Sequence, residues 1–246
     1  MPNAPAADQR RLLDVQALDT RLDQLAHKRR TLPEHARITE LDAQVADLHT
    51  ALVTSQTAVA DLRRELAKAE ADVQQVRDRS ARNQARLDAG QGTAKDLQAL
   101  QHELESLAKR QGDLEEVELE VMERLEAHES ALGEVSAAHA QLVESRSAVE
   151  AQRDAALADV DAQAAQVQAE RSTAAAGLEA TLVALYDRLR GQLGGVGAAA
   201  LRGRRCEGCR LELNPLDLDA ITNKPDDAVV RCEECGRILV RLPEGQ

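Results

Sequence analysis

The sequence predicts a mainly α-helical protein, in which a long antiparallel coiled-coil hairpin is followed by a small C-terminal β zinc ribbon. Three observations lead to this fold class. Apolar residues recur at heptad spacing along two stretches that flank a short glycine-containing break, the 246 residues include one Tyr but no Phe or Trp, and four cysteines form two Cys-x2-Cys pairs near the C-terminus. A composition with 30% charged residues and almost no aromatic volume favours long helices over one compact globule.

Four parts are expected along the chain. Residues 1–7 are expected to be a disordered tail, residues 8–190 the hairpin, residues 191–203 a linker and residues 204–246 the zinc ribbon. The linker expectation depends on the segment "GQLGGVGAAALRG", whose glycines and alanines favour a hinge or loop over a helix.

The first arm of the hairpin begins with apolar residues at three- and four-residue spacing from Val15 to Leu25. Pro33 interrupts this pattern, and because proline removes a helix hydrogen bond, we expect a kink or break near residue 33. Beyond it, one heptad register runs unbroken from Ile38 to Leu87, which is seven heptads. A register of this length predicts a coiled coil rather than an ordinary amphipathic helix.

Residues 89–93 are expected to form the turn between the two arms. Gly90 suits the position that follows a helix C-terminus, where φ is positive. Thr93 and Asp96 have the spacing of a capping box that opens a new helix. Because a short connection joins two long helices, the arms are expected to be antiparallel neighbours.

The second arm carries a new heptad register from Leu97 to Leu142, with His128 and His139 among its polar members. We interpret both histidines as polar core positions that set the register at some cost in stability. The alternative, a metal site or a pH switch, lacks candidate partner ligands nearby. Beyond Leu142 the seam weakens, until "GLEATLVALYDRLR" restores an apolar face up to about residue 190.

The four cysteines have the spacing of a metal site: Cys206-x2-Cys209 and, after 22 residues, Cys232-x2-Cys235. Two such pairs complete a tetrahedral set of four sulfurs, the pattern of structural zinc, so we expect one structural Zn²⁺ per chain. Iron also fits a four-sulfur site. A reducing compartment disfavours two disulfides. A redox pair of the thioredoxin type would need a βαβ context, which the sequence lacks. A catalytic zinc would keep one coordination position open, and four cysteine ligands leave none.

Short elements are expected around the cysteines. The segments "DAVVRC" and "RILVRL" predict strands, with Ile238, Val240 and Leu242 on one face. Asn214 and Pro215 predict the N-cap and first residue of a helix over about 215–222. A module of about 45 residues with so few apolar side chains is expected to depend on metal binding for its folding energy.

Six arginines around the cysteines form a candidate surface for a partner or for phosphate groups. They are Arg202, Arg204, Arg205, Arg210, Arg231 and Arg237. Residues 200–246 contain eight basic and nine acidic side chains, and no aromatic side chain on which a base could stack. The whole chain has a net charge of −12, whereas nucleic-acid binders usually carry a basic domain or stripe. Protein contact is therefore favoured, and RNA or DNA binding is the alternative.

The sequence also predicts which classes of protein to set aside. No apolar run resembles a signal peptide or a membrane span, which predicts a cytoplasmic location without membrane association. The segment "GGVGAAAL" lacks the Lys-Ser/Thr ending of a phosphate-binding loop, and no nucleophile–base set stands out. We therefore expect a protein that is not an enzyme and has no small-molecule substrate. Its partners are expected to be proteins that bind along the hairpin or the ribbon.

Three stretches carry a resemblance to a known family: "AKDLQALQHELESL" after the turn, "LYDRLR" at the end of the second arm, and the segment from "LRGRRCEGCRLELNP" to "VVRCEECGRILVR". The chain resembles the bacterial C4-type zinc ribbon proteins that have an N-terminal coiled-coil hairpin. The resemblance implies a non-enzymatic adaptor with the four cysteines as zinc ligands. Some members are linked to an alternative sigma factor, to flagellar or secretion machinery, and to RNA binding. Arg210 departs from the pattern, since a glycine often follows the second cysteine of such a pair.

Overall fold

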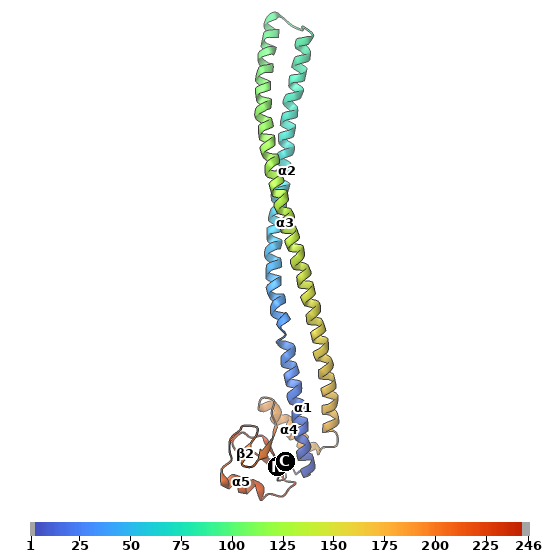
Figure 1. Cartoon of the computed structure of the whole chain (residues 1–246), viewed down its shortest axis with the longest axis vertical. Helices are drawn as coiled ribbons and strands as arrows, with labels where there is room; N and C mark the ends of the chain where they lie inside the picture. The colour runs from blue at the N-terminus through green and yellow to red at the C-terminus, as the bar shows by residue number, and fades with distance from the viewer. Residues whose placement is uncertain (1–2, 243–246) are drawn as a thin grey trace. The chain divides into compact units, whose positions relative to one another are not determined.

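The structure is a computed structural model that describes residues 3–242, and it confirms the predicted fold class: a long helical hairpin is followed by a small strand-containing ribbon (Figure 1). The chain forms two compact units. Residues 36–150 make up the first, which we call the hairpin unit. The second, which we call the ribbon unit, joins the residues up to His35 with those from Ala151 onward.

The hairpin unit consists of two antiparallel helical segments, which belong to α2 (Pro33–Asp88) and α3 (Ala94–Ala175). On α2 the residues of the predicted heptad register form the buried face, whereas the remaining positions are mostly exposed. The most deeply buried ones are Ile38, Leu41, Val59, Leu62, Ala69, Val73 and Asn83. Leu100 and Val121 of α3 are buried as well. The heptad seam is therefore the core of this unit.

Ion pairs between the two arms fix their register. Arg63 pairs with Glu129 at 2.6 Å, and Arg77 pairs with Glu115 at 2.6 Å. All four side chains are more than a third exposed, and ion pairs at such positions contribute little to stability. Their contribution is specificity, because opposite charges meet only when the arms are aligned in one way.

The turn has the predicted construction. α2 ends at Asp88 and α3 begins at Ala94, and Gly90 has a φ of 62° in the left-handed region that glycine tolerates. The Thr93 hydroxyl accepts a hydrogen bond from the Asp96 amide at 3.3 Å, and the Asp96 carboxylate accepts one from the Thr93 amide at 2.9 Å. These two reciprocal bonds form the capping box expected from the sequence.

The two histidines of the second arm differ from each other. His139 is half-buried, and its ring lies 5.8 Å from the ring of His49 on the opposite arm. His128 is exposed, so the interpretation of this residue as a core position is wrong. The heptad pattern places His128 at the seam, but in the structure the residue is open to solvent.

The ribbon unit begins with α1 (Ala6–Arg30). Because α1 ends at Arg30 and α2 starts at Pro33, the chain breaks where the proline predicted it. Leu25 of α1 is buried against Val160 and Val167 of α3, so the heptad pattern of α1 has a partner in the last turns of α3.

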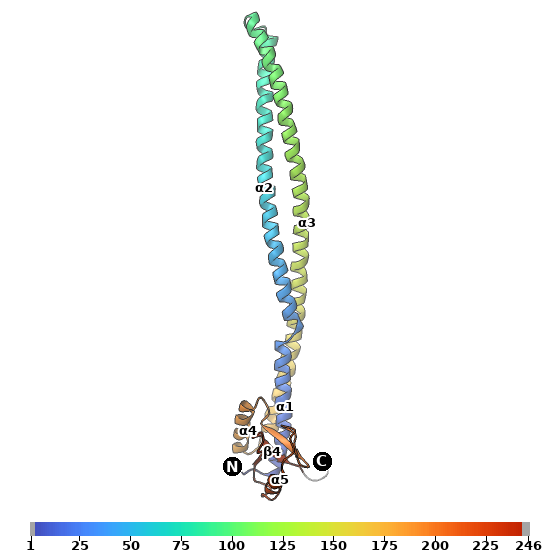
Figure 2. The same cartoon turned by 90° about the vertical axis from the view of Figure 1, so that its left-hand side faces the viewer.

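The second arm ends earlier than the sequence indicated. α3 stops at Ala175, and a separate helix, α4 (Ala180–Gln192), follows a turn in which Gly177 has a φ of 77°. Within the expected hairpin, residues 8–190, the second long helix therefore stops before the end, and the last part of the segment is a separate helix. The apolar face of α4 packs on the ribbon sheet and on α1. Figure 2 shows α4 as a separate helix near the strands.

The ribbon sheet has four strands in the order β2-β1-β4-β3: β1 (Ala198–Arg202), β2 (Arg205–Cys206), β3 (Val230–Arg231) and β4 (Ile238–Arg241). β1 and β4 are parallel, and the outer pairs are antiparallel. The strands predicted around Cys232 are confirmed, as is a helix that Asn214 caps, α5 (Pro215–Thr222). The expected linker over 191–203 is wrong at its end, because residues 198–202 form a strand inside the sheet.

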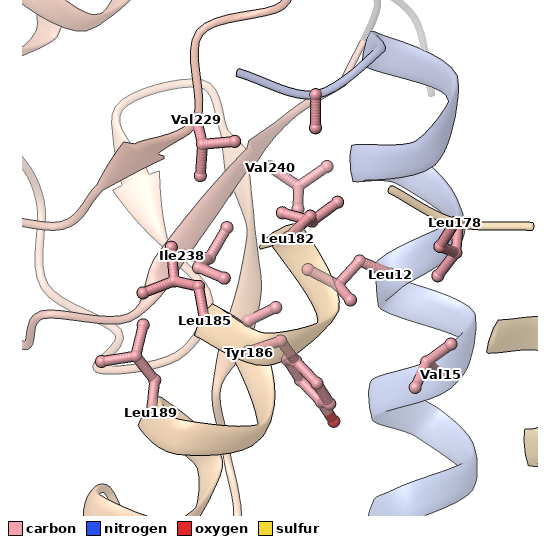
Figure 3. Packing of buried hydrophobic residues seen from close by; sticks show 12 residues of the cluster. Leu12, Val15, Leu178, Leu182, Leu185, Tyr186, Leu189, Val229, Ile238 and Val240 are labelled. Atoms are coloured by element: carbon pink, nitrogen blue, oxygen red, sulfur yellow. The ribbon is translucent and has the colours of Figure 1, made fainter. Parts of the chain in front are cut away.

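Both faces of this sheet are buried. Ile238 and Val240 of β4 point to one face, where they pack with Leu12 of α1 and with Leu182 and Tyr186 of α4 (Figure 3). Leu239 points to the other face and packs with Leu213, Ile221 and the cysteines. The ribbon therefore shares one of its two cores with α1 and α4, and is not a separate module.

The chain's beginning also belongs to this unit. The Ala4 amide donates to the Asp227 carbonyl at 2.8 Å, Asn3 pairs with Ala228 as an isolated bridge, and Ala4 is buried. The expected disordered tail over residues 1–7 is therefore wrong for residues 3–7, because a small apolar side chain fills a site in the core. Residues 1–2 lie outside the described residues.

None of the helices within residues 3–242 combines the length and the hydropathy that a membrane crossing requires.

Candidate metal centre

Two turns of the same construction present the cysteines. In the first, the Cys206 carbonyl accepts from the Arg210 amide at 2.7 Å; in the second, the Cys232 carbonyl accepts from the Gly236 amide at 2.8 Å. The Cys206 amide donates to the Leu211 carbonyl at 3.0 Å, and the Cys232 amide donates to the Arg237 carbonyl at 2.9 Å. Each turn is therefore closed by backbone hydrogen bonds, and each contributes two cysteines to one group of four sulfurs.

The four sulfurs form a closed set. Cys206 and Cys235 have their sulfurs 3.9 Å apart, as do Cys209 and Cys232, and all four sulfurs lie within 4.8 Å of one another. A tetrahedral site with Zn–S bonds of about 2.3 Å requires S···S separations of about 3.8 Å. The donor set therefore fits zinc, and none of the four cysteines forms a disulfide. No other group of His, Cys, Asp or Glu within residues 3–242 has metal-site geometry.

The surroundings of the thiols differ. Burial raises the pKa of Cys206, and burial also raises the pKa of Cys232 to about 12. Burial opposes the ionisation of Cys235 too, but hydrogen bonds from the Arg237 amide and side chain outweigh it and hold the pKa of Cys235 at about 7. Cys206 and Cys232 therefore become thiolates when a cation arrives, and metal binding releases protons.

Arg210 takes the backbone conformation that the family pattern assigns to glycine. Its φ is 61°, and Gly236, at the equivalent position of the second turn, has a φ of 74°. Within residues 3–242, Arg210 is the one residue other than glycine with a positive φ. The turn keeps its geometry without the glycine, at a backbone cost of about 1–3 kcal/mol.

The six arginines predicted as a contact surface divide into two groups. Arg202, Arg204, Arg205 and Arg210 are exposed, and their side chains take part in no ion pair or hydrogen bond among the described residues. The other two are half-buried and bind backbone carbonyls. Arg231 donates to Gly236 at 2.6 Å, and Arg237 donates to Val196 at 3.0 Å and to Leu193 at 3.1 Å.

Arg237 thereby joins the second cysteine turn to the chain between α4 and β1. Its side chain also covers the first turn, because a Cβ added at Gly208 would lie 2.7 Å from the Arg237 Cδ. Arg241 has a similar structural role, since its guanidinium donates to five carbonyls between Ile221 and Ala228. The basic surface of the ribbon is therefore smaller than the sequence suggested.

A buried polar cluster connects α1, α3 and α4, and sequence reasoning did not find it. The Asp19 carboxylate accepts a hydrogen bond from the Tyr186 hydroxyl at 2.7 Å and pairs with Arg171 at 3.2 Å and Arg190 at 3.6 Å. Burial, followed by the hydrogen bond to Asp19, raises the pKa of Tyr186 above its ordinary value. The signal was present in "LYDRLR", which contains both Tyr186 and Arg190.

Gln16 connects α1 to the start of β1. Its side-chain oxygen accepts from the Gly197 amide at 2.8 Å, and its nitrogen donates to the Gly195 carbonyl at 3.0 Å. At Gly197 a Cβ would lie 2.8 Å from the Tyr186 carbonyl oxygen, so only glycine fits there. A single glutamine on a helix face carries no signal in the sequence, and its role depends entirely on the strand that reaches it.

Fold and site together define a zinc ribbon protein with a helical hairpin. Residues 15–194 match the CT398-like coiled coil hairpin domain, and residues 205–239 match the C4-type zinc ribbon domain. The chain therefore belongs to the CT398-like coiled-coil hairpin family, with a C4-type zinc ribbon at its C-terminal end.

Relatives from mycobacteria match almost the whole chain. A protein of Mycobacterium tuberculosis (strain H37Rv) is 37% identical over 239 residues, which are 97% of either chain. A solved structure from Mycobacterium smegmatis has a TM-score of 0.86 at 37% identity and covers 97% of this chain and 100% of that one. CT398 from Chlamydia trachomatis, with a TM-score of 0.68 at 19% identity over 96% and 98% of the two chains, is similar in fold.

Proposed function

We propose that the protein is a non-enzymatic scaffold that binds other proteins and is stabilised by one structural zinc ion per chain. The observation that carries the proposal is the closed set of four sulfurs within 4.8 Å of one another. A tetrahedral metal with four protein ligands has no position for water or substrate. When bound, zinc supplies a cross-link between the two cysteine turns rather than reaction chemistry.

The exposed apolar side chains of the ribbon support protein contact. Leu216, at the start of α5, is 81% exposed, and Leu211, beside the first cysteine turn, is 52% exposed. Single exposed leucines are ordinary on protein surfaces. Here they accompany exposed arginines near the first cysteine turn, and arginine is enriched at protein interfaces.

Nucleic-acid binding is the second candidate function. One observation favours it: Arg202, Arg204, Arg205 and Arg210 are exposed and have no acidic partner among the described residues, so they are available to phosphate groups. Against it stand the inward roles of Arg231 and Arg237 and the acidic residues of the same module. We also propose the cytoplasm as the site of action, because thiols remain reduced and available to zinc there.

An affinity purification with the full-length, zinc-loaded chain separates the two functions. The protein is used as bait in lysate with and without nuclease, beside a bait that carries Arg202→Ser, Arg204→Ser and Arg205→Ser. The scaffold proposal expects partners that survive nuclease and still bind the variant. Partners that are lost after nuclease treatment and are also lost with the arginine variant would instead establish the nucleic-acid function and overturn the scaffold.

A further inference from the structure

The row of ion pairs along one side of the hairpin unit has a gap. Arg63–Glu129 and Arg77–Glu115 are two heptads apart on both arms, so the register places Glu70 opposite Met122, midway between them. The uncharged thioether of Met122 cannot neutralise the Glu70 carboxylate. Glu70 takes part in no ion pair or hydrogen bond within the described residues, and it is exposed. The gap therefore leaves one carboxylate without a cation.

An apolar surface fills this gap. Met122 is 46% exposed, and Leu119, one turn earlier on the same side of α3, is 59% exposed. They border an open hollow of about 280 Å³, whose floor includes Leu66 of α2 and Leu125 of α3. The outer positions of a two-helix coiled coil are normally polar, so two neighbouring large apolar side chains beside a hollow call for an occupant.

The charge around the hollow is strongly negative. Residues 113–129 contain eight acidic side chains and one arginine, Arg124, which already pairs with Glu65 at 3.5 Å. Glu123 and Glu126 border the hollow, are exposed, and have no partner among residues 3–242. With Glu70 they place three unneutralised carboxylates around Leu119 and Met122.

We propose that this surface is a docking site for a cationic amphipathic helix of a partner protein. The apolar stripe of that helix would contact Leu119 and Met122, and its Lys or Arg residues would pair with Glu70, Glu123 and Glu126. A second copy of this chain in a two-fold contact would bring the same carboxylates together, which repel. Nucleic acids and anionic membranes are excluded as occupants by the sign of their charge.

The proposal rests on the scaffold function and names the chemistry of one of its partners. The test uses a fluorescent helical peptide of about 18 residues, or about five turns, built from Leu and Lys in an amphipathic pattern, and its Leu/Glu counterpart. Fluorescence anisotropy measures the binding of each peptide to the full-length, zinc-loaded protein. The Lys peptide is expected to bind and the Glu peptide is not.

Matched variants separate the site from general attraction to an acidic protein. Replacing Leu119 and Met122 by Gln should weaken binding about tenfold or more, as loss of a central apolar contact does. The control, Val53→Gln with Val143→Gln, removes exposed apolar groups elsewhere on the same unit and should leave binding unchanged. Circular dichroism checks that each variant keeps its helices.

Charge is tested in the same way. The triple variant Glu70→Gln, Glu123→Gln and Glu126→Gln should weaken binding and reduce its salt dependence, whereas Asp47→Asn, Glu134→Gln and Glu144→Gln should do neither. Equal affinity for the site and control variants would overturn the proposal. Dimerisation of the protein that is lost in Leu119→Gln would also overturn it, because a second copy would then be the occupant. Failure of the peptide test, with nuclease-resistant partners still recovered, refutes the docking site and leaves the scaffold function intact.

Discussion

Removing one zinc ligand is expected to destabilise the whole ribbon unit, including helices far from the cysteines in the chain. Cys232 belongs to the core on one face of the sheet, while Val229, Ile238 and Val240 belong to the core shared with α1 and α4. In Cys232→Ser the metal can no longer be held by four thiolates. Because metal binding contributes about 10–16 kcal/mol in zinc-finger peptides, the strands around it should loosen.

The effect on α1 and α4 follows from the shared core. Burial of one Val or Ile side chain contributes about 1.5–3 kcal/mol, so loss of Val229, Ile238 and Val240 removes about 5–9 kcal/mol of apolar burial. The stability of a typical domain is about 5–15 kcal/mol. The ribbon unit therefore has too little burial left to keep α4 packed on α1.

Hydrogen exchange measured by mass spectrometry is the appropriate assay. Peptides from α1, α4 and residues 198–242 should lose protection in Cys232→Ser or after chelation, whereas peptides from residues 36–150 should keep it. Glu233→Gln, an exposed neighbour that is not a ligand, is the control. If exchange rises only beyond residue 198 while α1 and α4 stay protected, the ribbon folds as a separate module and the reasoning is refuted.

Four further predictions follow from individual contacts. Elemental analysis of protein purified without added metal should find about one zinc per chain, and less than half an equivalent would contradict the site. Leu62→Asp places a charge in the buried seam, which costs several kcal/mol of stability. The helical signal in circular dichroism should therefore fall while zinc stays bound. Zinc release that accompanies the loss of helix would contradict this, because it would show that the hairpin unit and the ribbon unit unfold together. Tyr186→Phe should cost about 1.5–3 kcal/mol in urea unfolding, because the buried Asp19 carboxylate loses a hydrogen-bond donor. Asp19→Ala should cost as much or more, because it leaves the Tyr186 hydroxyl unpaired and removes one carboxylate from Arg171 and from Arg190, which keep Asp187 and Asp23 as partners; negligible costs for both variants would refute the cluster. Hydrogen bonds from the side chain and then the backbone of Thr93 lower the pKa of Asp96. The stabilisation by Asp96 is therefore present above its unfolded pKa of about 3.9 and is lost as the pH falls through the lower folded value. On acidification the thermal midpoint should fall less in Asp96→Asn than in the parent protein, and identical pH profiles would contradict this.

The parts of the fold that depend on local signals were predictable from the sequence. The heptad register from Ile38 to Leu87, the break before Pro33 and the capping box at Thr93 each depend on residues within a few positions of one another. The cysteine site was equally clear, because two Cys-x2-Cys pairs separated by 22 residues are typical of a structural metal site.

The parts that depend on distant partners were not predictable. Residues 198–202 contain three alanines, which have little intrinsic preference for strands, and they form β1 because β4 pairs with them in parallel. The small side chains are then an advantage, since a Cβ at Gly208 would lie only 2.9 Å from the Cβ of Ala199. The sequence likewise does not separate α4 from the second arm, because an apolar helix face does not specify which surface it covers.

The contact between Asp19 and Tyr186 has a consequence for synthesis on the ribosome. The two residues are 167 positions apart, so at about 5–20 residues per second α1 waits on the order of 8–33 s before α4 has been made. The strands that complete its core come later still. Residues 36–150 contain both arms of their own seam and are translated in between, so they can fold while α1 is still without a partner. The nascent chain therefore exposes Leu12 and Val15 until translation is nearly finished, and its first helix is among the last to be buried.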